Sequence, residues 1–114
     1  MINMIIKNVS KEQLLFKAEG WEEYYIPDYL FYYKGVYCGG FSIRNNSYIY
    51  NVTIKPRFWN LGAGTAMMRE ITSFFTKELY LKTCSPKAFH IYQKVGFKTE
   101  FTSGSWHNMK YERT

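Results

Sequence analysis

Acidic residues are scarce in this chain. Nine Asp and Glu stand against 15 Lys and Arg, so the 114 residues carry a formal net charge of +6. This balance favours anionic partners and makes the protein a poor electrostatic host for a polycation such as an aminoglycoside. A nucleotide-containing ligand and a nucleic acid both meet the condition. Charge therefore narrows the choice of partner without deciding between these two.

Cysteine and long apolar runs are also lacking. Cys38 and Cys84 are too few for a disulfide framework, which favours reduced thiols in a cytoplasmic protein. No run of about 18 apolar residues occurs, so no membrane-spanning helix is expected. The apolar start, Met1 to Ile6, is too short for the core of a signal peptide. The two His and two Cys lack metal-ligand spacing, so we expect no metal site.

Aromatic residues, by contrast, are abundant. They make up 20% of the chain, with 11 Tyr and 9 Phe, and bulky rings let a short chain bury much apolar area per residue. A hydrophobic content of 46% is typical of globular proteins. Because no internal repeat, low-complexity tract or linker divides the chain, we expect a single domain over residues 1–114.

The order of apolar patterns predicts an α+β fold, with a mixed sheet and flanking helices. A capping box at Ser10–Gln13 predicts a short helix that closes at Gly20. A second helix is expected from the glycines near residue 62 to Lys77–Glu78, and a third from Ser85 to Gly96. Strands are expected at Met1–Val9, Tyr29–Tyr33, Val36–Ile43, Tyr48–Ile54 and Leu79–Cys84, from Phe97 onward, and at Trp106–Glu112.

Two features refine this order. Gly39 and Gly40 lie inside a predicted strand, which indicates a bulge or a close approach by another backbone. The strands from Tyr29 to Ile54 follow one another through short turns, so they are expected to form an antiparallel meander. The strand at Leu79–Cys84 should run parallel to Tyr48–Ile54, because a helix connects the two.

A glycine-rich turn separates the strand at Tyr48–Ile54 from the second helix. The turn consists of Leu61, Gly62, Ala63, Gly64 and Thr65, and the expected apolar face of the helix then consists of Met67, Ile71, Phe74 and Phe75. Free N–H groups and the positive end of the helix dipole create an anion site at such a position. Glycine has no Cβ, so a phosphate can approach the main chain closely.

The spacing excludes two common phosphate-binding patterns. The P-loop needs four residues between its glycines, followed by Gly-Lys-Ser/Thr, and no such run occurs. The dinucleotide pattern needs a third glycine where Met67 stands and an acidic residue about 20 positions later. Lys82 lies there instead.

The segment from Trp59 to Gly64 resembles the acyl-CoA-binding motif of the GNAT superfamily of N-acyltransferases. That motif is Arg/Gln-x-x-Gly-x-Gly/Ala, and Trp59 stands here in place of its Arg or Gln. A second segment, Ser85 to Phe97, is similar to the family pattern Asn-x-x-Ala-x-x-x-Tyr-x-x-x-Gly-Phe. It matches at Ala88, Tyr92, Gly96 and Phe97, with Ser85 in place of the asparagine. The resemblance covers roughly residues 29 to 112.

The resemblance implies a GNAT-like fold and an N-acetyltransferase that uses acetyl-CoA as co-substrate and a primary amine as acceptor. It implies that the parallel strands splay apart to admit the thioester arm. Main-chain groups of Val52, Thr53 and Ile54 would pair with the pantetheine, and the turn from Leu61 to Thr65 would bind the diphosphate. Tyr92 would protonate the departing sulfur, since a tyrosine of ordinary pKa stays protonated at neutral pH.

Several alternatives stay open at this stage. The strand at Tyr48–Ile54 contains no acidic residue, so no general base is evident, and a GNAT-like module that binds CoA or another protein with weak turnover is the main alternative. A small nucleic-acid-binding module is a third alternative, but the basic residues are scattered and form no run. The short N-terminal part leaves an acceptor pocket that is either open or completed by another subunit, as in a homodimer.

Overall fold

The fold is built on a single mixed sheet. The computed structural model describes residues 2–11 and 26–113, and all structural statements below concern these residues. Their strands form one sheet in the order β1-β2-β3-β4-β5-β7-β6. The strands are β1 (Met4–Lys7), β2 (Tyr29–Tyr33), β3 (Val36–Arg44), β4 (Tyr48–Ile54), β5 (Leu79–Thr83), β6 (Lys98–Ser103) and β7 (Trp106–Tyr111). The helices are η1 (Pro56–Phe58), α1 (Ala63–Phe74) and α2 (Pro86–Val95).

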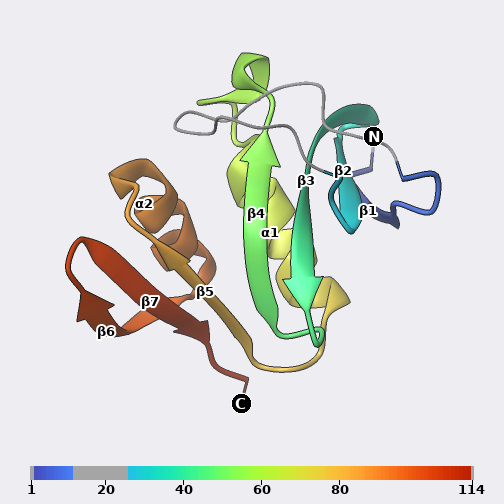
Figure 1. Cartoon of the computed structure of the whole chain (residues 1–114). Coiled ribbons are helices and arrows are strands. Elements are labelled where there is room, and N and C mark those ends of the chain that lie inside the picture. Colours follow the sequence, from blue (N-terminus) through green and yellow to red (C-terminus); the bar gives the residue numbers. More distant parts are fainter. Residues whose placement is uncertain (1, 12–25, 114) are drawn as a thin grey trace.

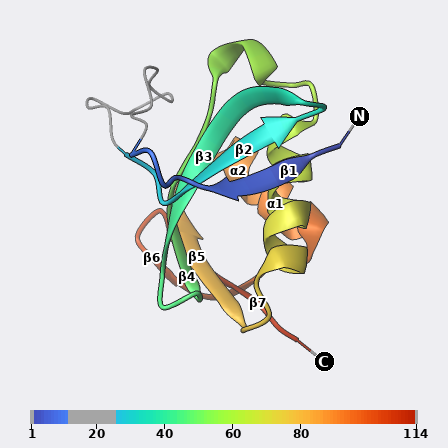
Figure 2. The same cartoon turned by 90° about the vertical axis from the view of Figure 1, so that its right-hand side faces the viewer.

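The sheet consists of an antiparallel meander and a C-terminal antiparallel part, joined by one parallel pair. Strands β1 to β4 pair antiparallel in sequence order, and β5 pairs antiparallel with β7. The junction is β4 with β5, which run parallel because α1 connects them. Helices α1 and α2 both cover the same face of the sheet, as Figure 2 shows. This layout confirms the predicted mixed α+β fold.

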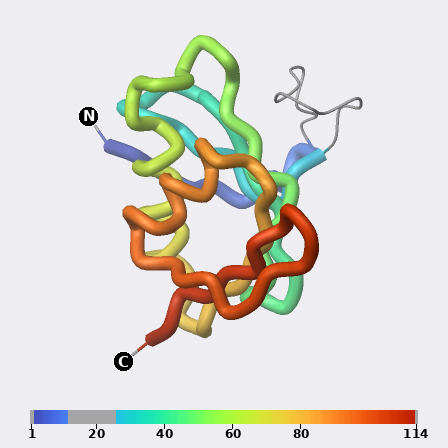
Figure 3. The backbone as a smooth tube through the Cα atoms, turned by 90° about the vertical axis from the view of Figure 1, so that its left-hand side faces the viewer, coloured from blue at the N-terminus to red at the C-terminus, as the bar shows by residue number. Residues whose placement is uncertain are grey.

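The core lies between this sheet face and the two helices, which pack side by side (Figure 3). Met67 and Ile71 of α1 are fully buried, as the helical periodicity predicts. They meet apolar residues from alternate strand positions, among them Ile49, Leu79 and Met109. Burial of this kind contributes roughly 1.5–3 kcal/mol for each large side chain.

The glycines of β3 confirm the predicted close approach of backbones. A Cβ on Gly39 would lie 2.2 Å from the carbonyl oxygen of Thr53, and a Cβ on Gly40 would lie 2.7 Å from that of Tyr29. Both distances are shorter than real Cβ contacts. The register with β4 also shifts between Gly40 and Ser42. Only glycine allows β3 to fit between its neighbours at these two positions.

Helix α1 ends earlier than the sequence pattern predicts, and this prediction was wrong. The helix stops at Phe74, not at Lys77–Glu78, because Phe75 adopts an extended conformation (φ −99°, ψ 136°). This change turns Phe75 into the core, where it packs edge-on against Tyr29 and Phe41. Phe74, expected on the buried face, keeps 53% of its surface exposed.

Other boundaries differ by one to three residues. Strand β1 is shorter than the predicted Met1–Val9, and β6 begins at Lys98 because Phe97 belongs to the turn that closes α2. The helix predicted from the capping box to Gly20 lies outside the described residues. Within the described part, neither helix is long and apolar enough to cross a membrane.

Candidate functional site

The parallel strands β4 and β5 separate soon after they begin. One residue pair, Tyr48 with Tyr80, is in register between them, whereas β3 and β4 share five such pairs. The main-chain N–H of Tyr80 donates to the carbonyl of Ser47 at 2.9 Å, which fixes the joined end. Beyond it the two strands diverge, as Figure 1 shows. The predicted splayed pair is therefore confirmed.

A bulge in β4 accompanies the divergence. Asn51 has a φ of 52°, in the left-handed region that few non-glycine residues adopt, and Asn is among those that tolerate it best. Two residues, Asn51 and Val52, face only Phe41 of β3 between the pairs Tyr50 with Ser42 and Thr53 with Gly40. A bulge bends its strand and increases the local twist. It thus directs the second half of β4 away from β5.

The divergence opens a groove of about 1030 Å³, which we call the β4–β5 groove. Its walls come from β4, β5, β7, α1 and α2 and from the segment between β4 and α1. Residues predicted as site residues that line it are Val52, Ile54, Gly62, Gly64, Thr65 and Tyr92. The groove therefore connects the glycine turn with Tyr92 of the second motif through the gap between β4 and β5.

The glycine turn forms the N-terminus of α1. Gly62 is the N-cap with a φ of 85°, and no side chain caps the helix within the described residues. The first N–H groups of an α-helix have no acceptor inside the helix. Those of Ala63, Gly64 and Thr65 lie at this end, where the helix dipole favours an anion. A Cβ on Gly64 would lie 3.1 Å from the Cδ1 atom of Ile91, so the missing Cβ lets the first turn of α1 pack closely against α2.

The three remaining predicted residues do not line the groove with their side chains. Thr53 and Ala63 are buried, and Leu61 is 60% exposed. The carbonyl of Leu61 accepts a hydrogen bond from the Tyr33 hydroxyl at 3.1 Å. This bond ties the glycine turn to β2. The assignment of Thr53, Leu61 and Ala63 to cofactor binding concerned their main-chain groups and stays a prediction.

Trp59, which replaces the Arg or Gln of the resembled motif, has a defined structural role. Its indole N–H donates to the carbonyl of Ile54 at 2.8 Å, so the ring closes the segment between β4 and α1. The ammonium group of Lys87, on α2, lies 5.2 Å from the centre of the Trp59 ring. Both residues line the groove. Lys87, which sequence reasoning missed, thus places a positive charge beside the position where the resembled motif has Arg or Gln.

Tyr92 lies on α2 and faces the core side of the groove. Only 7% of its surface is exposed, and its ring packs against Phe97 at 6.0 Å between centres. Burial raises the pKa of the Tyr92 phenol to about 12, because the charged form loses its solvation. The phenol is consequently protonated across the physiological range and can donate a proton into the groove.

The groove is lined by basic side chains and lacks carboxylates among the described residues. Lys82, Lys87 and Lys94 line it, and no Asp or Glu does. His90 is exposed and also lines the groove. Two positions separate it from Tyr92, and on a helix this spacing predicts a surface residue that points away from the face of Tyr92. Cys84 also lines the groove and is exposed, whereas Cys38 is buried in the core. No three His, Cys, Asp or Glu side chains gather within the described parts of the chain.

The comparisons with known proteins agree with this geometry. The model of the family described as the acetyltransferase (GNAT) family matches residues 10–97. This range includes the glycine turn, both diverging strands and α2. No curated protein and no solved structure matches significantly.

Proposed function

Because the chain belongs to the GNAT acetyltransferase family, we propose that it transfers an acetyl group from acetyl-CoA to a primary amine by direct attack within a ternary complex. The observation that carries the proposal is the β4–β5 groove, which joins an anion site at a helix N-terminus to a buried phenol. A cofactor with a diphosphate at one end and a thioester at the other needs both features in one passage. The family assignment alone supports acyl transfer in general.

The cofactor would be held mainly by the main chain. The N–H groups of the turn from Leu61 to Thr65 would bind the diphosphate, with Lys87 adding a nearby positive charge. Main-chain groups of Val52, Thr53 and Ile54 would pair with the pantetheine arm, in place of the strand partner that β5 ceases to provide after Tyr80. The bulge at Asn51 supports this role, because it directs that stretch away from β5.

The reaction then needs few side chains. The amine nitrogen attacks the thioester carbonyl carbon, and the carbonyl oxygen gains negative charge that main-chain N–H groups at the edge of β4 would stabilise. The C–S bond breaks as the amide forms, and the Tyr92 phenol gives its proton to the departing sulfur. The proton lost by the amine passes to water and restores the phenol. The products are an N-acetylated amine and CoA with a free thiol.

Release of the CoA thiol over a panel of amines tests the proposal. We expect acetyl-CoA to raise the thermal stability of the protein and at least one amine to release thiol at a rate that depends on its concentration. Binding at 100 times the dissociation constant would add about 2.7 kcal/mol to the free energy of unfolding. If acetyl-CoA does not stabilise the protein and no amine causes thiol release, the proposal is rejected.

One observation favours a second candidate, a CoA-binding module with weak turnover. The described residues that line the groove include no carboxylate to accept the proton of the amine. Under this alternative acetyl-CoA would stabilise the protein, but no amine would accelerate thiol release over the rate in buffer.

A further inference from the structure

The β4–β5 groove passes through the sheet and reaches its other face. The glycine turn, Lys87 and Ile91 line the groove on the helix side. Tyr48, Tyr50, Lys82 and Trp106 line it on the other side of the sheet. Alternation along β5 separates these two sides: Leu79 and Leu81 are buried towards the helices, so Tyr80 and Lys82 face away from them. Tyr48 is in register with Tyr80, which places it on the same face.

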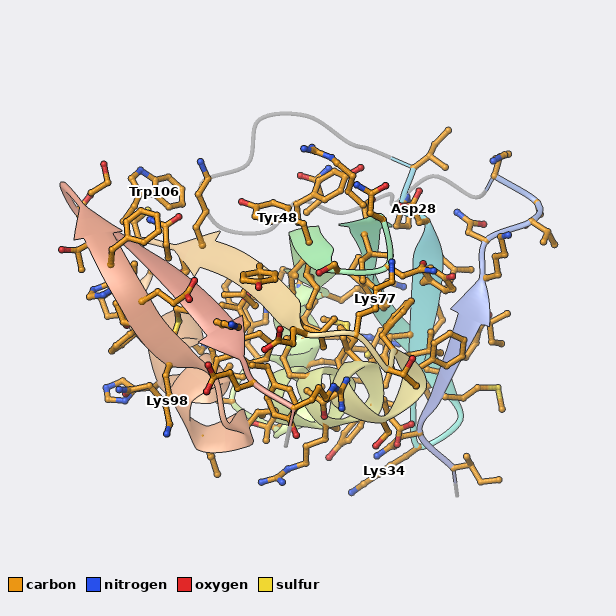
Figure 4. The ribbon with its side chains drawn as sticks, turned by 90° about the horizontal axis from the view of Figure 1, so that it is seen from below. Asp28, Lys34, Tyr48, Lys77, Lys98 and Trp106 are labelled. Atoms are coloured by element: carbon orange, nitrogen blue, oxygen red, sulfur yellow. The ribbon has the colours of Figure 1, made fainter. Side chains whose placement is uncertain are left out.

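Figure 4 shows this arrangement directly: Tyr48 and Trp106 lie on the side of the sheet away from the two helices. Tyr48, Tyr50, Lys82 and Trp106 line this side of the groove, and we call them, together with Arg44, the aromatic mouth. Arg44 does not line the groove itself but borders it, because its guanidinium lies near the rings of Tyr48 and Tyr50. An acceptor that meets the thioester inside the groove would enter here, since the diphosphate end occupies the helix side.

The two positive charges of the aromatic mouth have no acidic partner among residues 2–11 and 26–113. The Arg44 guanidinium lies 5.7 Å from the ring centre of Tyr48 and 5.3 Å from that of Tyr50. The Lys82 ammonium lies 5.2 Å from the ring centre of Trp106. No carboxylate of the described residues forms an ion pair with either one.

Lys110, on the neighbouring strand, differs in this respect. Its ammonium group lies 3.2 Å from a carboxylate oxygen of Glu78 and 3.6 Å from one of Glu112. Among the described residues, Arg44 and Lys82 therefore lack the acidic partners that Lys110 has. Aromatic rings hold them in place and provide an apolar surface beside them.

We infer that the acceptor is an apolar or aromatic amine that also carries an anionic group, either a carboxylate or a phosphate. This inference rests on the proposed acetyl transfer. The anionic group would lie against Arg44 and Lys82, and the apolar part against Tyr50 and Trp106. The amine would then point into the gap between β4 and β5. A polyamine or other polycation would meet two uncompensated positive charges and is excluded from this mouth.

Matched amines test the inference by thiol release. Phenylalanine, phenylalaninamide and phenethylamine share one ring and differ in charge, alanine lacks the ring, and O-phosphoethanolamine carries a phosphate. We expect an acidic amine to have the highest kcat/KM, with phenylalanine above both counterparts that lack its carboxylate and above alanine. A preference for phosphate over carboxylate would identify the anionic group. A higher kcat/KM for phenethylamine, phenylalaninamide or spermidine would overturn the inference while leaving the proposed function intact.

Variants separate the acceptor from the cofactor. Arg44→Gln and Lys82→Gln should each raise the KM of the best acidic acceptor about tenfold, since each removes a charged contact, and should leave the KM of acetyl-CoA unchanged. Lys98→Gln, on the exposed strand β6, removes one positive charge outside the groove and serves as the control. Equal effects of all three variants would contradict the inference. Absence of thiol release with every amine would reject both this inference and the proposed function.

Discussion

At the scale of single residues, the account depends on side chains whose surroundings set their chemistry. Tyr92 is a tyrosine among 11 in the chain, and what distinguishes it is its position on the wall of a groove together with near-complete burial. Burial raises the pKa of the phenol, and under the proposed function the phenol would protonate the departing sulfur. Gly64 matters for the side chain it lacks, because a Cβ there would meet Ile91 of α2 at 3.1 Å.

Replacing Tyr92 tests its role as proton donor. We expect Tyr92→Phe to lower kcat about 100-fold, within the usual range for a lost general acid, and to leave the dissociation constant of acetyl-CoA unchanged. Steady-state kinetics and calorimetric titration measure the two quantities. Tyr32→Phe, which removes a hydroxyl from half-buried β2, is the control. Full turnover by Tyr92→Phe would remove the phenol from the mechanism.

The raised pKa of Tyr92 also predicts how stability depends on pH. Between its ordinary pKa of 10.0 and the folded value of about 12, the folded protein holds a proton that the unfolded chain loses. The free energy of unfolding should therefore be highest below pH 10 and fall as the pH rises, by roughly 1–3 kcal/mol from this group. Chemical denaturation at increasing alkaline pH should show a smaller fall for Tyr92→Phe. Parallel curves for the two proteins would contradict the prediction.

Substitutions at Gly64 separate folding from cofactor binding. An aspartate in the first turn of α1 interacts favourably with the helix dipole, so Gly64→Asp should fold. Its carboxylate would occupy the anion site, so we expect the affinity for acetyl-CoA to fall at least about 100-fold. Gly64→Ala is the matched control, because its methyl group meets only the flexible end of Ile91 and should weaken binding far less. Undiminished binding by Gly64→Asp would show that the turn is not the site.

At the scale of elements, the sequence predicts strands and turns better than the geometry between them. The bounds of β2 and β4 match their predictions, since β-branched and aromatic residues stand between clear turn signals. The end of α1 was missed because Phe75 continues the apolar periodicity of the helix while its backbone has already left it. The bulge at Asn51 was also missed, although an asparagine inside an apolar strand is a signal that could have revealed it.

Site residues that depend on contacts between distant elements were beyond the sequence. The pairing of Lys87 with the ring of Trp59 joins residues 28 positions apart, and no local pattern predicts it. The aromatic mouth likewise draws on β3, β4, β5 and β7, whose register becomes known only in the folded sheet. The glycine turn and Tyr92, in contrast, lie within continuous motifs and could be proposed from the resemblance of those motifs to the GNAT patterns.

The bulge in β4 can be tested by its backbone conformation. Asn51→Val introduces a β-branched residue at a φ of 52°, which should lower the free energy of unfolding by about 1–2 kcal/mol. If the strain is relieved by straightening β4, the affinity for acetyl-CoA should fall as well. Asn51→Gly, which tolerates the conformation, should bind acetyl-CoA like the parent. Chemical denaturation and calorimetry measure both effects, and a Val variant as stable as the parent would show that the bulge carries no strain.

At the scale of the whole molecule, one gap in the sheet organises the protein. The sheet is divided where β4 and β5 part, the helices stand on one side of the gap and the aromatic mouth on the other. A net charge of +6 adds a field that attracts anionic ligands from both sides. Under the proposed function, the same small fold would provide a cofactor entrance and an acceptor entrance that meet at the divergence of β4 and β5.

The measurement that tests this most directly is a crystal structure of the protein with CoA bound. The account predicts that the diphosphate lies on the main-chain N–H groups between Leu61 and Thr65, that the pantetheine runs along β4, and that the sulfur lies within hydrogen-bonding reach of the Tyr92 hydroxyl. A cofactor bound elsewhere, with the glycine turn empty and the gap between β4 and β5 closed by side chains, would contradict it.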